Sequence, residues 1–193
     1  MKKESIFSSV KNITLIAMLT AMSVVIAMFC KSVLNFGGGL FRISFESLPI
    51  ILSGILFGPV AGGFVGLSAD LIGYFLSGQA YPINILVTVG SASIGIVSGF
   101  IAKYVFKKRS NLQIILSGAL AHAVGSMTLK TVGLFQFYGW AVLVRVPIYL
   151  VICALEVFLL CVLFKRSGFR RLVDGVDASL SEETKTESEE DKE

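Results

Sequence analysis

The sequence predicts an all-α integral membrane protein, built as a bundle of six transmembrane helices. Composition is the first observation behind this prediction. Hydrophobic residues make up 54% of the 193 residues and charged residues only 16%, whereas a soluble domain has about 25% charged residues. The other two observations are apolar runs long enough to cross a bilayer and a segregation of charge along the chain.

The charged residues divide the chain into two parts. Residues 174–193 hold nine acidic residues and two lysines, a composition that buries no core and predicts a disordered acidic C-terminal tail. Residues 1–173 form the predicted membrane domain. They contain fifteen Lys and Arg residues against four acidic ones, namely Glu4, Glu46, Asp70 and Glu156.

Four apolar runs are each long enough to form a membrane span, which needs roughly 20 residues. They cover residues 13–30, 83–105, 112–131 and 144–164. The first run follows a basic start, as in a signal peptide, but it is long and lacks a small-residue cleavage site. We therefore expect it to be the first membrane helix.

The segment Leu48 to Leu76 is long enough for one tilted span or two short ones. Gly58-Pro59 in its middle removes a backbone donor and favours a turn, which predicts short spans at residues 45–57 and 60–76. Six spans place all three basic clusters on one face, and five would place two of them outside. The positive-inside rule thus predicts six helices in the cell membrane with both termini cytoplasmic. The clusters are Lys2, Lys3 and Lys11; Lys103, Lys107, Lys108 and Arg109; and Lys165, Arg166, Arg170 and Arg171.

Small residues recur at every fourth position in three series, which involve four of the predicted spans. They are Gly54, Gly58, Gly62 and Gly66; Ser91, Gly95 and Gly99; and Ala17 with Ala21. In lipid, small residues at this spacing allow helix backbones to approach closely. We expect the glycines to pack helices together, whereas Ala17 and Ala21 could equally form a groove that faces lipid or a partner protein.

Charged residues also stand where topology does not require them. Lys31, Arg42, Glu46, Lys130 and Arg145 lie near the predicted outer face, with Asp70 and Glu156 inside spans. A charge within the bilayer costs several kcal/mol unless it is paired or hydrated, so such residues are functional candidates. The alternative is an ion pair that only fixes helix packing.

Aromatic residues gather on the same side, where an interfacial belt would explain many of them. The segments that carry them, residues 37–39, 77–82 and 136–139, also hold glycines and polar groups. Flexible aromatic loops over a polar cavity would suit a flat organic ligand. This adds an outward-facing ligand cavity to the predicted bundle.

Motifs of nucleotide binding and hydrolysis are missing from the sequence, including GxxxxGK[ST], GxSxG, HExxH and GxGxxG. His122 lies in an apolar span and is interpreted as a buried core histidine, while Cys30, Cys153 and Cys161 are too widely spaced for a metal site. We therefore expect no catalytic residues, metal, cofactor or nucleic-acid partner. A small integral-membrane enzyme or a scaffold of envelope assembly remains the alternative class.

Three stretches carry a family resemblance: LPIILSGILFGPVAGGFVGLSADLIGYF from Leu48, YPIN from Tyr81 and LFQFYGWAVLVRVPIYLV from Leu134. Over about residues 10–166 the chain resembles the substrate-binding S components of energy-coupling-factor (ECF) vitamin transporters, most closely the folate type. The resemblance implies a six-helix protein that captures a vitamin outside the cell. It also implies a transmembrane coupling protein and two cytoplasmic ATPases as partners.

The resemblance bears on individual residues as well. The AxxxA motif that meets the coupling protein in this family matches Ala17 to Ala21, which favours a partner-facing groove. Folate-type members often carry a PGFT-like segment where this chain has YPINILVT, keeping Pro82 but not the glycine. An S component for pantothenate or hydroxymethylpyrimidine is therefore the alternative to folate.

These observations lead to a site hypothesis for folate or a related pterin. Glu46 or Asp70 would accept hydrogen bonds from the amino-substituted ring. The basic residues Arg42, Lys130 and Arg145 would attract the anionic end, and Tyr81, Phe135 and Trp140 would stack on the ring. The alternative for Arg42 and Glu46 is a salt bridge between residues four apart, worth a few tenths of a kcal/mol.

Overall fold

The structure is a computed structural model that describes residues 10–36, 41–77, 84–105, 110–169, 171 and 173–176. This part of the chain is almost entirely helical. The α-helices are α1 (Val10–Val33), α2 (Ser47–Phe57), α3 (Pro59–Leu76), α4 (Ile85–Phe100), α5 (Asn111–His122), α6 (Thr131–Tyr138) and α7 (Arg145–Lys165). Two strands, β1 (Asn35–Phe36) and β2 (Phe41–Arg42), form a two-residue antiparallel ladder after α1.

Three further helical segments join these helices into longer rods. The π-helix η2 (Ile101–Val105) extends α4, and the π-helix η3 (Ala123–Lys130) joins α5 to α6. The 3-10 helix η4 (Gly139–Val144) follows α6 after a turn at Gly139, where φ is 54°. The described chain therefore forms six helical rods, of which α2 is the shortest, and this confirms the predicted six-helix fold.

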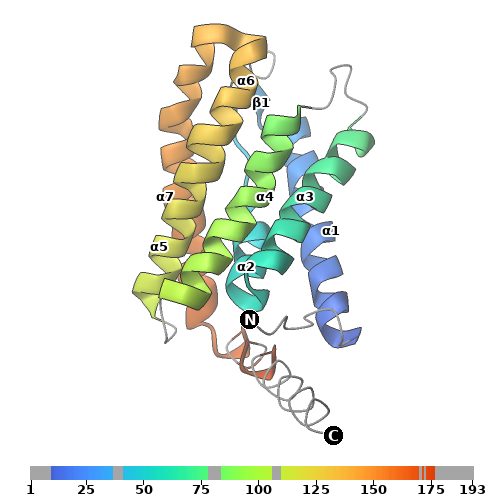
Figure 1. Ribbon diagram of the computed structural model, residues 1–193, viewed down its shortest axis with the longest axis vertical. Coiled ribbons are helices and arrows are strands. Elements are labelled where there is room, and N and C mark those ends of the chain that lie inside the picture. Colours follow the sequence, from blue (N-terminus) through green and yellow to red (C-terminus); the bar gives the residue numbers. More distant parts are fainter. Residues whose placement is uncertain are drawn as a thin grey trace, which may run out of the picture.

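The helices run side by side along one axis (Figure 1). We call the end that carries β1, β2 and η4 the loop end. We call the opposite end, where α1 begins and α7 finishes, the terminal end. Helices α1, α3 and α6 all end at the loop end, as the predicted topology requires.

Gly58 and Pro59 separate α2 from α3, as predicted. Gly58 has φ 89°, a conformation that favours glycine, and Pro59 opens α3, where its missing N–H is not needed. Helix α2 has 11 residues, about 16 Å at 1.5 Å per residue, so it is too short to cross a bilayer alone. Almost every residue of α2 is buried, which explains its continuous apolar sequence.

Glycines bring α3 and α4 into backbone contact. A Cβ atom placed on Gly62 would lie 2.5 Å from the Gly95 carbonyl oxygen, and one placed on Gly99 would lie 2.5 Å from the Pro59 nitrogen. Real Cβ atoms do not approach that closely, so only glycine fits at these positions. The spacing of small residues thus reports tight intramolecular packing, as expected.

The outer surface of the bundle is apolar, with large side chains such as Val25, Phe29, Phe64, Ile96 and Phe158 exposed. Among the described residues, four helical stretches are long and apolar enough to cross a membrane: Val10–Val33, Pro59–Leu76, Ile85–Val105 and Asn111–Lys165. The last contains two passes, because the chain turns back at Gly139. The protein is therefore a multi-pass membrane protein.

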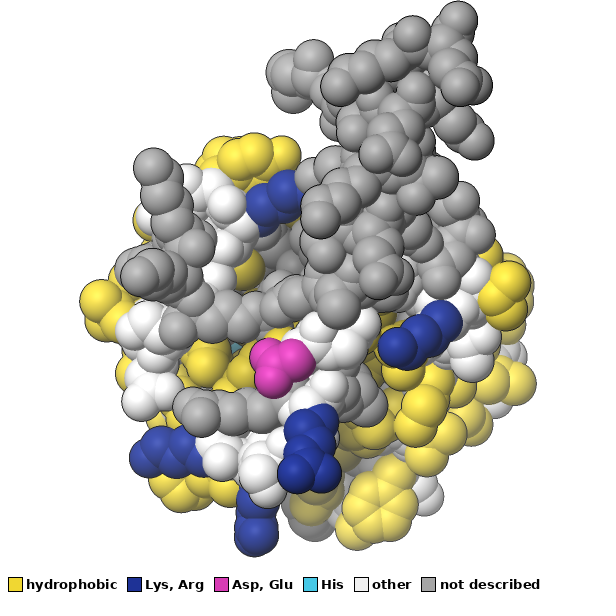
Figure 2. Space-filling view, turned by 90° about the horizontal axis from the view of Figure 1, so that it is seen from below, with side chains coloured by type: hydrophobic (Ala, Val, Ile, Leu, Met, Phe, Trp, Pro, Cys, Tyr) yellow, Lys and Arg dark blue, Asp and Glu magenta, His cyan; other side chains and the backbone are white. Residues whose placement is uncertain are grey.

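Basic side chains ring the terminal end, which Figure 2 shows from below. The exposed Lys and Arg residues in the described chain there are Lys11, Lys103, Lys165, Arg166 and Arg171. The other basic residues of the predicted clusters, and residues 177–193 of the predicted tail, lie outside the described residues.

Two sequence-based boundaries differ from the structure. Residues 136–138, expected in a loop, are the last turn of α6, because the apolar and aromatic run continues the helix as far as Gly139. The membrane domain was expected to end at residue 173, but Val176 also belongs to the hydrophobic core. Val173 and Val176 are buried, at 3% and 0% exposure.

Candidate functional site

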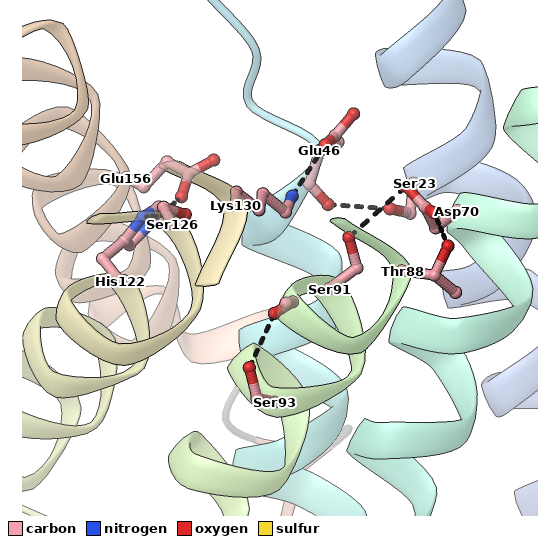
Figure 3. A network of polar contacts seen from close by, with 11 residues as sticks. Ser23, Glu46, Asp70, Thr88, Ser91, Ser93, His122, Ser126, Lys130 and Glu156 are labelled. Atoms are coloured by element: carbon pink, nitrogen blue, oxygen red, sulfur yellow. Dashed lines mark hydrogen bonds and ion pairs between the residues drawn. The ribbon is translucent and has the colours of Figure 1, made fainter. Parts of the chain in front are cut away.

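Polar and charged side chains gather in one layer inside the apolar bundle. We call this the polar layer and define it by Ser23, Glu46, Asp70, Thr88, Ser91, His122, Ser126, Lys130 and Glu156 (Figure 3). At 1.5 Å per residue, Asp70 lies about 9 Å from the loop end of α3, Lys130 about 12 Å from that of α6 and Glu156 about 16 Å from that of α7. The layer therefore extends from the half of the bundle nearer the loop end, at Asp70 and Lys130, to the middle of the bundle, at Glu156.

Lys130 and Glu46 form an ion pair at the centre of the layer. The Lys130 ammonium Nζ donates to Glu46 Oε1 at 3.0 Å, and the two side chains are only 8% and 17% exposed. Ser23 on α1 donates its hydroxyl to the Glu46 backbone carbonyl at 2.7 Å. Glu46 precedes α2 directly, so these two contacts fix the start of the buried helix.

The π-helix η3 presents Lys130 to the layer. His122, Ser126 and Lys130 are spaced four residues apart, and the wider turn of a π-helix keeps this spacing on one face. Helix α4 packs closely against this segment. A Cβ atom on Gly90 would lie 2.8 Å from the Lys130 Cγ atom, so the glycine makes room for the lysine stem.

Asp70 on α3 faces two hydroxyl groups of α4. Thr88 Oγ1 donates to Asp70 Oδ2 at 2.7 Å, and Ser91 Oγ makes a longer contact of 3.5 Å with Oδ1. Thr88 and Ser91 are three residues apart and so lie on the same face of α4. Asp70 is also within electrostatic reach of the Lys130 ammonium.

His122 and Glu156 pair on the α7 side of the layer. His122 Nε2 contacts Glu156 Oε2, and His122 Nδ1 contacts the Ser126 hydroxyl at 3.2 Å. His122 is 1% exposed and Glu156 is 0% exposed. His122 is thus a buried histidine, as the sequence predicted. Both of its ring nitrogens have a partner, and one of these partners is a carboxylate.

Some of the remaining residues predicted to bind the ligand lie at the loop end, and the others lie wholly or partly outside the described residues. Phe135 and Trp140 pack edge to face with ring centroids 5.5 Å apart. Their exposures of 42% and 78% place them on the outer surface, where amphipathic rings suit a membrane interface. Arg145 is buried at the start of α7, with its guanidinium 5.0 Å from the centre of the Tyr138 ring.

Tyr81 and the side chain of Arg42 lie outside the described residues; the Arg42 backbone belongs to β2, paired with Asn35. Ala17 and Ala21 are both exposed on α1. The structure thus brings Glu46, Asp70 and Lys130 together and leaves Phe135 and Trp140 at the surface.

Sequence reasoning missed the hydroxyl groups of Ser23, Thr88, Ser91 and Ser126. A signal was present, because Thr88 and Ser91 are three apart, and Ser126 is four from both His122 and Lys130, within otherwise apolar helices. Polar residues that share a helix face mark a polar interior. The described residues contain no group of three or more His, Cys, Asp or Glu side chains that could hold a metal ion.

Comparison with known proteins identifies the family of this chain. Residues 11–168 match the family described as "ECF transporter, substrate-specific component". The protein belongs to this family. Because the family is that of a binding component of transporters, the enzyme and scaffold alternatives are set aside.

Two curated proteins are similar to this family member over part of its length. The folate transporter FolT of Clostridium novyi (strain NT) is 29% identical over 104 residues, which are 52% of this chain and 57% of that protein. An uncharacterized MG098 homolog of Mycoplasma pneumoniae (strain ATCC 29342 / M129 / Subtype 1) is 28% identical over 123 residues, 58% of this chain and 22% of that protein. The match therefore spans less than two thirds of either relative.

The fold of this S component is also similar to a solved structure, described as the crystal structure of FolT bound with folic acid. The TM-score is 0.63 and the sequence identity 26%, and the match covers 82% of this chain and 96% of that one. At this coverage the similarity extends over most of the bundle.

Proposed function

We propose that the protein binds folate or a related pterin vitamin with high affinity, as the binding component of an ECF transporter. The observation that carries the proposal is the polar layer. Its carboxylates and its lysine are held inside a membrane bundle whose fold is similar to that of a protein bound to folic acid. Buried charges of this kind are costly in a membrane and mark functional sites.

The charges of the layer favour the ring end of such a ligand. The described residues supply three carboxylates, Glu46, Asp70 and Glu156, against one lysine and one histidine. A pterin ring presents amino and ring N–H donors, and carboxylates are strong acceptors for them. Among the described residues, Asp70 accepts only from the hydroxyl groups of Thr88 and Ser91 on α4, so it can accept further hydrogen bonds from a ligand.

The anionic end of the ligand would then lie closer to the loop end. Arg145 is buried there at the start of α7, and Arg42 belongs to β2 at the same end. Arginine favours carboxylates through its planar fork of donors. Tyr81 remains a candidate for stacking on the ring, whereas the surface positions of Phe135 and Trp140 favour a role at the mouth of the site.

We further propose that the loop end faces outward and the terminal end faces the cytoplasm. Five exposed basic residues surround the terminal end, which is the charge pattern of a cytoplasmic face. Partner proteins would be the transmembrane coupling protein and two cytoplasmic ATPases. The exposure of Ala17 and Ala21 on α1 supports a docking groove for the coupling protein.

Binding by the isolated protein tests the substrate. The full chain is reconstituted in lipid nanodiscs and titrated by calorimetry with folate, pantothenate and hydroxymethylpyrimidine. Saturable binding of folate at one site per chain is the expected result. Tight binding of either other vitamin without folate binding would assign a different substrate to the same site.

A further inference from the structure

Glu156 carries a carboxylate oxygen without a hydrogen-bond partner in the described part of the chain. Its Oε2 contacts His122, whereas its Oε1 is buried and contacts no donor. The whole residue is 0% exposed, near the middle of α7. A buried acceptor without a donor is unfavourable, because it has lost its water and gained no partner.

The orientation of this carboxylate is fixed by its neighbours. Ser126 contacts Nδ1 of His122 at 3.2 Å, and the opposite ring nitrogen holds Glu156 Oε2. Figure 3 shows one Glu156 oxygen directed at His122 and the other directed away from it. The free oxygen is therefore presented in one direction without the entropy cost of ordering a flexible side chain.

The free oxygen also belongs to the polar layer. The Glu156 carboxylate is within electrostatic reach of both Lys130 and Glu46. In Figure 3 the labelled side chains of Glu156, Lys130, Glu46 and Asp70 follow one another across the bundle. A flat ligand lying in this layer would have Asp70 on its α3 side and Glu156 on its α7 side.

We infer that Glu156 determines ligand specificity, by accepting a hydrogen bond at Oε1 from an N–H group of a nitrogen-rich heterocycle. This inference rests on the proposed function and assigns one contact within it. A carboxylate with a single free oxygen accepts from a donor and repels an anion or a ring acceptor. The exocyclic amino group of a pterin is a donor of this kind, and a methyl group in its place is not.

The test compares two ligands on the intact protein in nanodiscs: folate, and a folate analogue whose 2-amino group is replaced by methyl. Binding is measured for the wild type and for Glu156→Gln, which preserves the size of the side chain. A hydrogen bond to a charged acceptor changes affinity by about 10- to 100-fold. The wild type should therefore prefer folate by about that factor, and Glu156→Gln should lose the preference by binding folate more weakly.

A matched control is Ser117→Ala, which removes another buried oxygen that has no partner in the described residues but belongs to α5 outside the polar layer. Its affinity for both ligands should equal that of the wild type. If Glu156→Gln does not fold, Glu156→Asp keeps the charge opposite His122, withdraws the oxygen by one methylene and should reduce the preference in the same direction.

Three results would overturn the inference in distinguishable ways. Equal affinity of the wild type for the two ligands means that Oε1 holds only water in the complex. An equal loss for both ligands in the Glu156 variants means that the residue acts on packing alone. A wild type that binds no folate at all overturns the proposed function itself, and the inference with it.

Discussion

The Lys130 ammonium donates to the Glu46 carboxylate at 3.0 Å, which joins two residues 84 positions apart in the sequence. One stands at the end of the π-helix η3 and the other immediately before the buried helix α2. The contact thereby ties the fifth membrane pass to the connection that leads into the second. Because both side chains are largely buried, the pair acts on stability as well as on the charge of the polar layer.

Lys130→Met should destabilise the protein by about 3 kcal/mol, because it removes the ammonium that pairs with the largely buried Glu46 carboxylate. The change should lower the thermal midpoint of the purified protein and weaken folate binding. In the double variant Lys130→Met, Glu46→Gln, most of the stability should return, because the carboxylate is neutralised together with the ammonium, whereas folate binding should stay weak. Additive losses of stability would show that the two residues do not interact.

Gly62→Ala should destabilise the α3 and α4 packing by about 1–3 kcal/mol, the range for adding a methyl group to a filled core. Its Cβ atom would lie 2.5 Å from the Gly95 carbonyl oxygen and 2.7 Å from the Gly54 Cα. Gly73→Ala on the same helix is the control, because its Cβ meets nothing within 4 Å. Thermal unfolding should show a lower midpoint for the first variant, and an unchanged or higher one for the second because alanine favours helix.

His122→Leu should destabilise the protein by about 3–5 kcal/mol, because Glu156 is then a buried carboxylate without a partner. Adding Glu156→Leu should restore much of this loss, since an apolar pair replaces the charged one. Chemical denaturation of the two variants and the wild type measures the difference. A double variant that is less stable than His122→Leu alone would contradict this account of the pair.

Ala17→Leu combined with Ala21→Leu should abolish ATP-driven folate uptake by the assembled transporter and leave folate binding unchanged. The two side chains are exposed on α1, and larger ones would hold a partner helix away from the backbone. The control is Ala154→Leu, an exposed alanine on α7. Uptake by vesicles that contain the coupling protein and ATPases gives the measurement; normal uptake by the double variant would remove α1 from the docking surface.

The sequence was sufficient for the fold because its signals act locally. Gly58-Pro59 predicts the break between α2 and α3, and the basic clusters predict an even number of passes. The burial of α2 could not be predicted in the same way, because a continuous apolar run is compatible with lipid exposure as well as with a core. The end of α6 was missed, because glycine and polar residues near position 139 resemble a loop that begins earlier.

The site was only partly predictable, because its contacts join distant segments. A charged side chain within a membrane is energetically unfavourable unless it has a role, and this identified Glu46, Asp70 and Lys130 as candidates. Their partners depend on the rotation of each helix about its axis. The π-helix η3 turns Lys130 toward Glu46 and Ser126 toward His122. The spacing of four residues indicates that these side chains share a face, but it does not indicate which neighbour that face meets.

A crystal structure of the protein in complex with folate tests the central claim most directly. The account predicts the pterin ring in the polar layer, within hydrogen-bonding distance of Asp70 and Glu156, with the glutamate end directed toward Arg145 and the loop end. Folate bound elsewhere on the bundle, with Lys130, Asp70 and Glu156 remote from the ring, would contradict it.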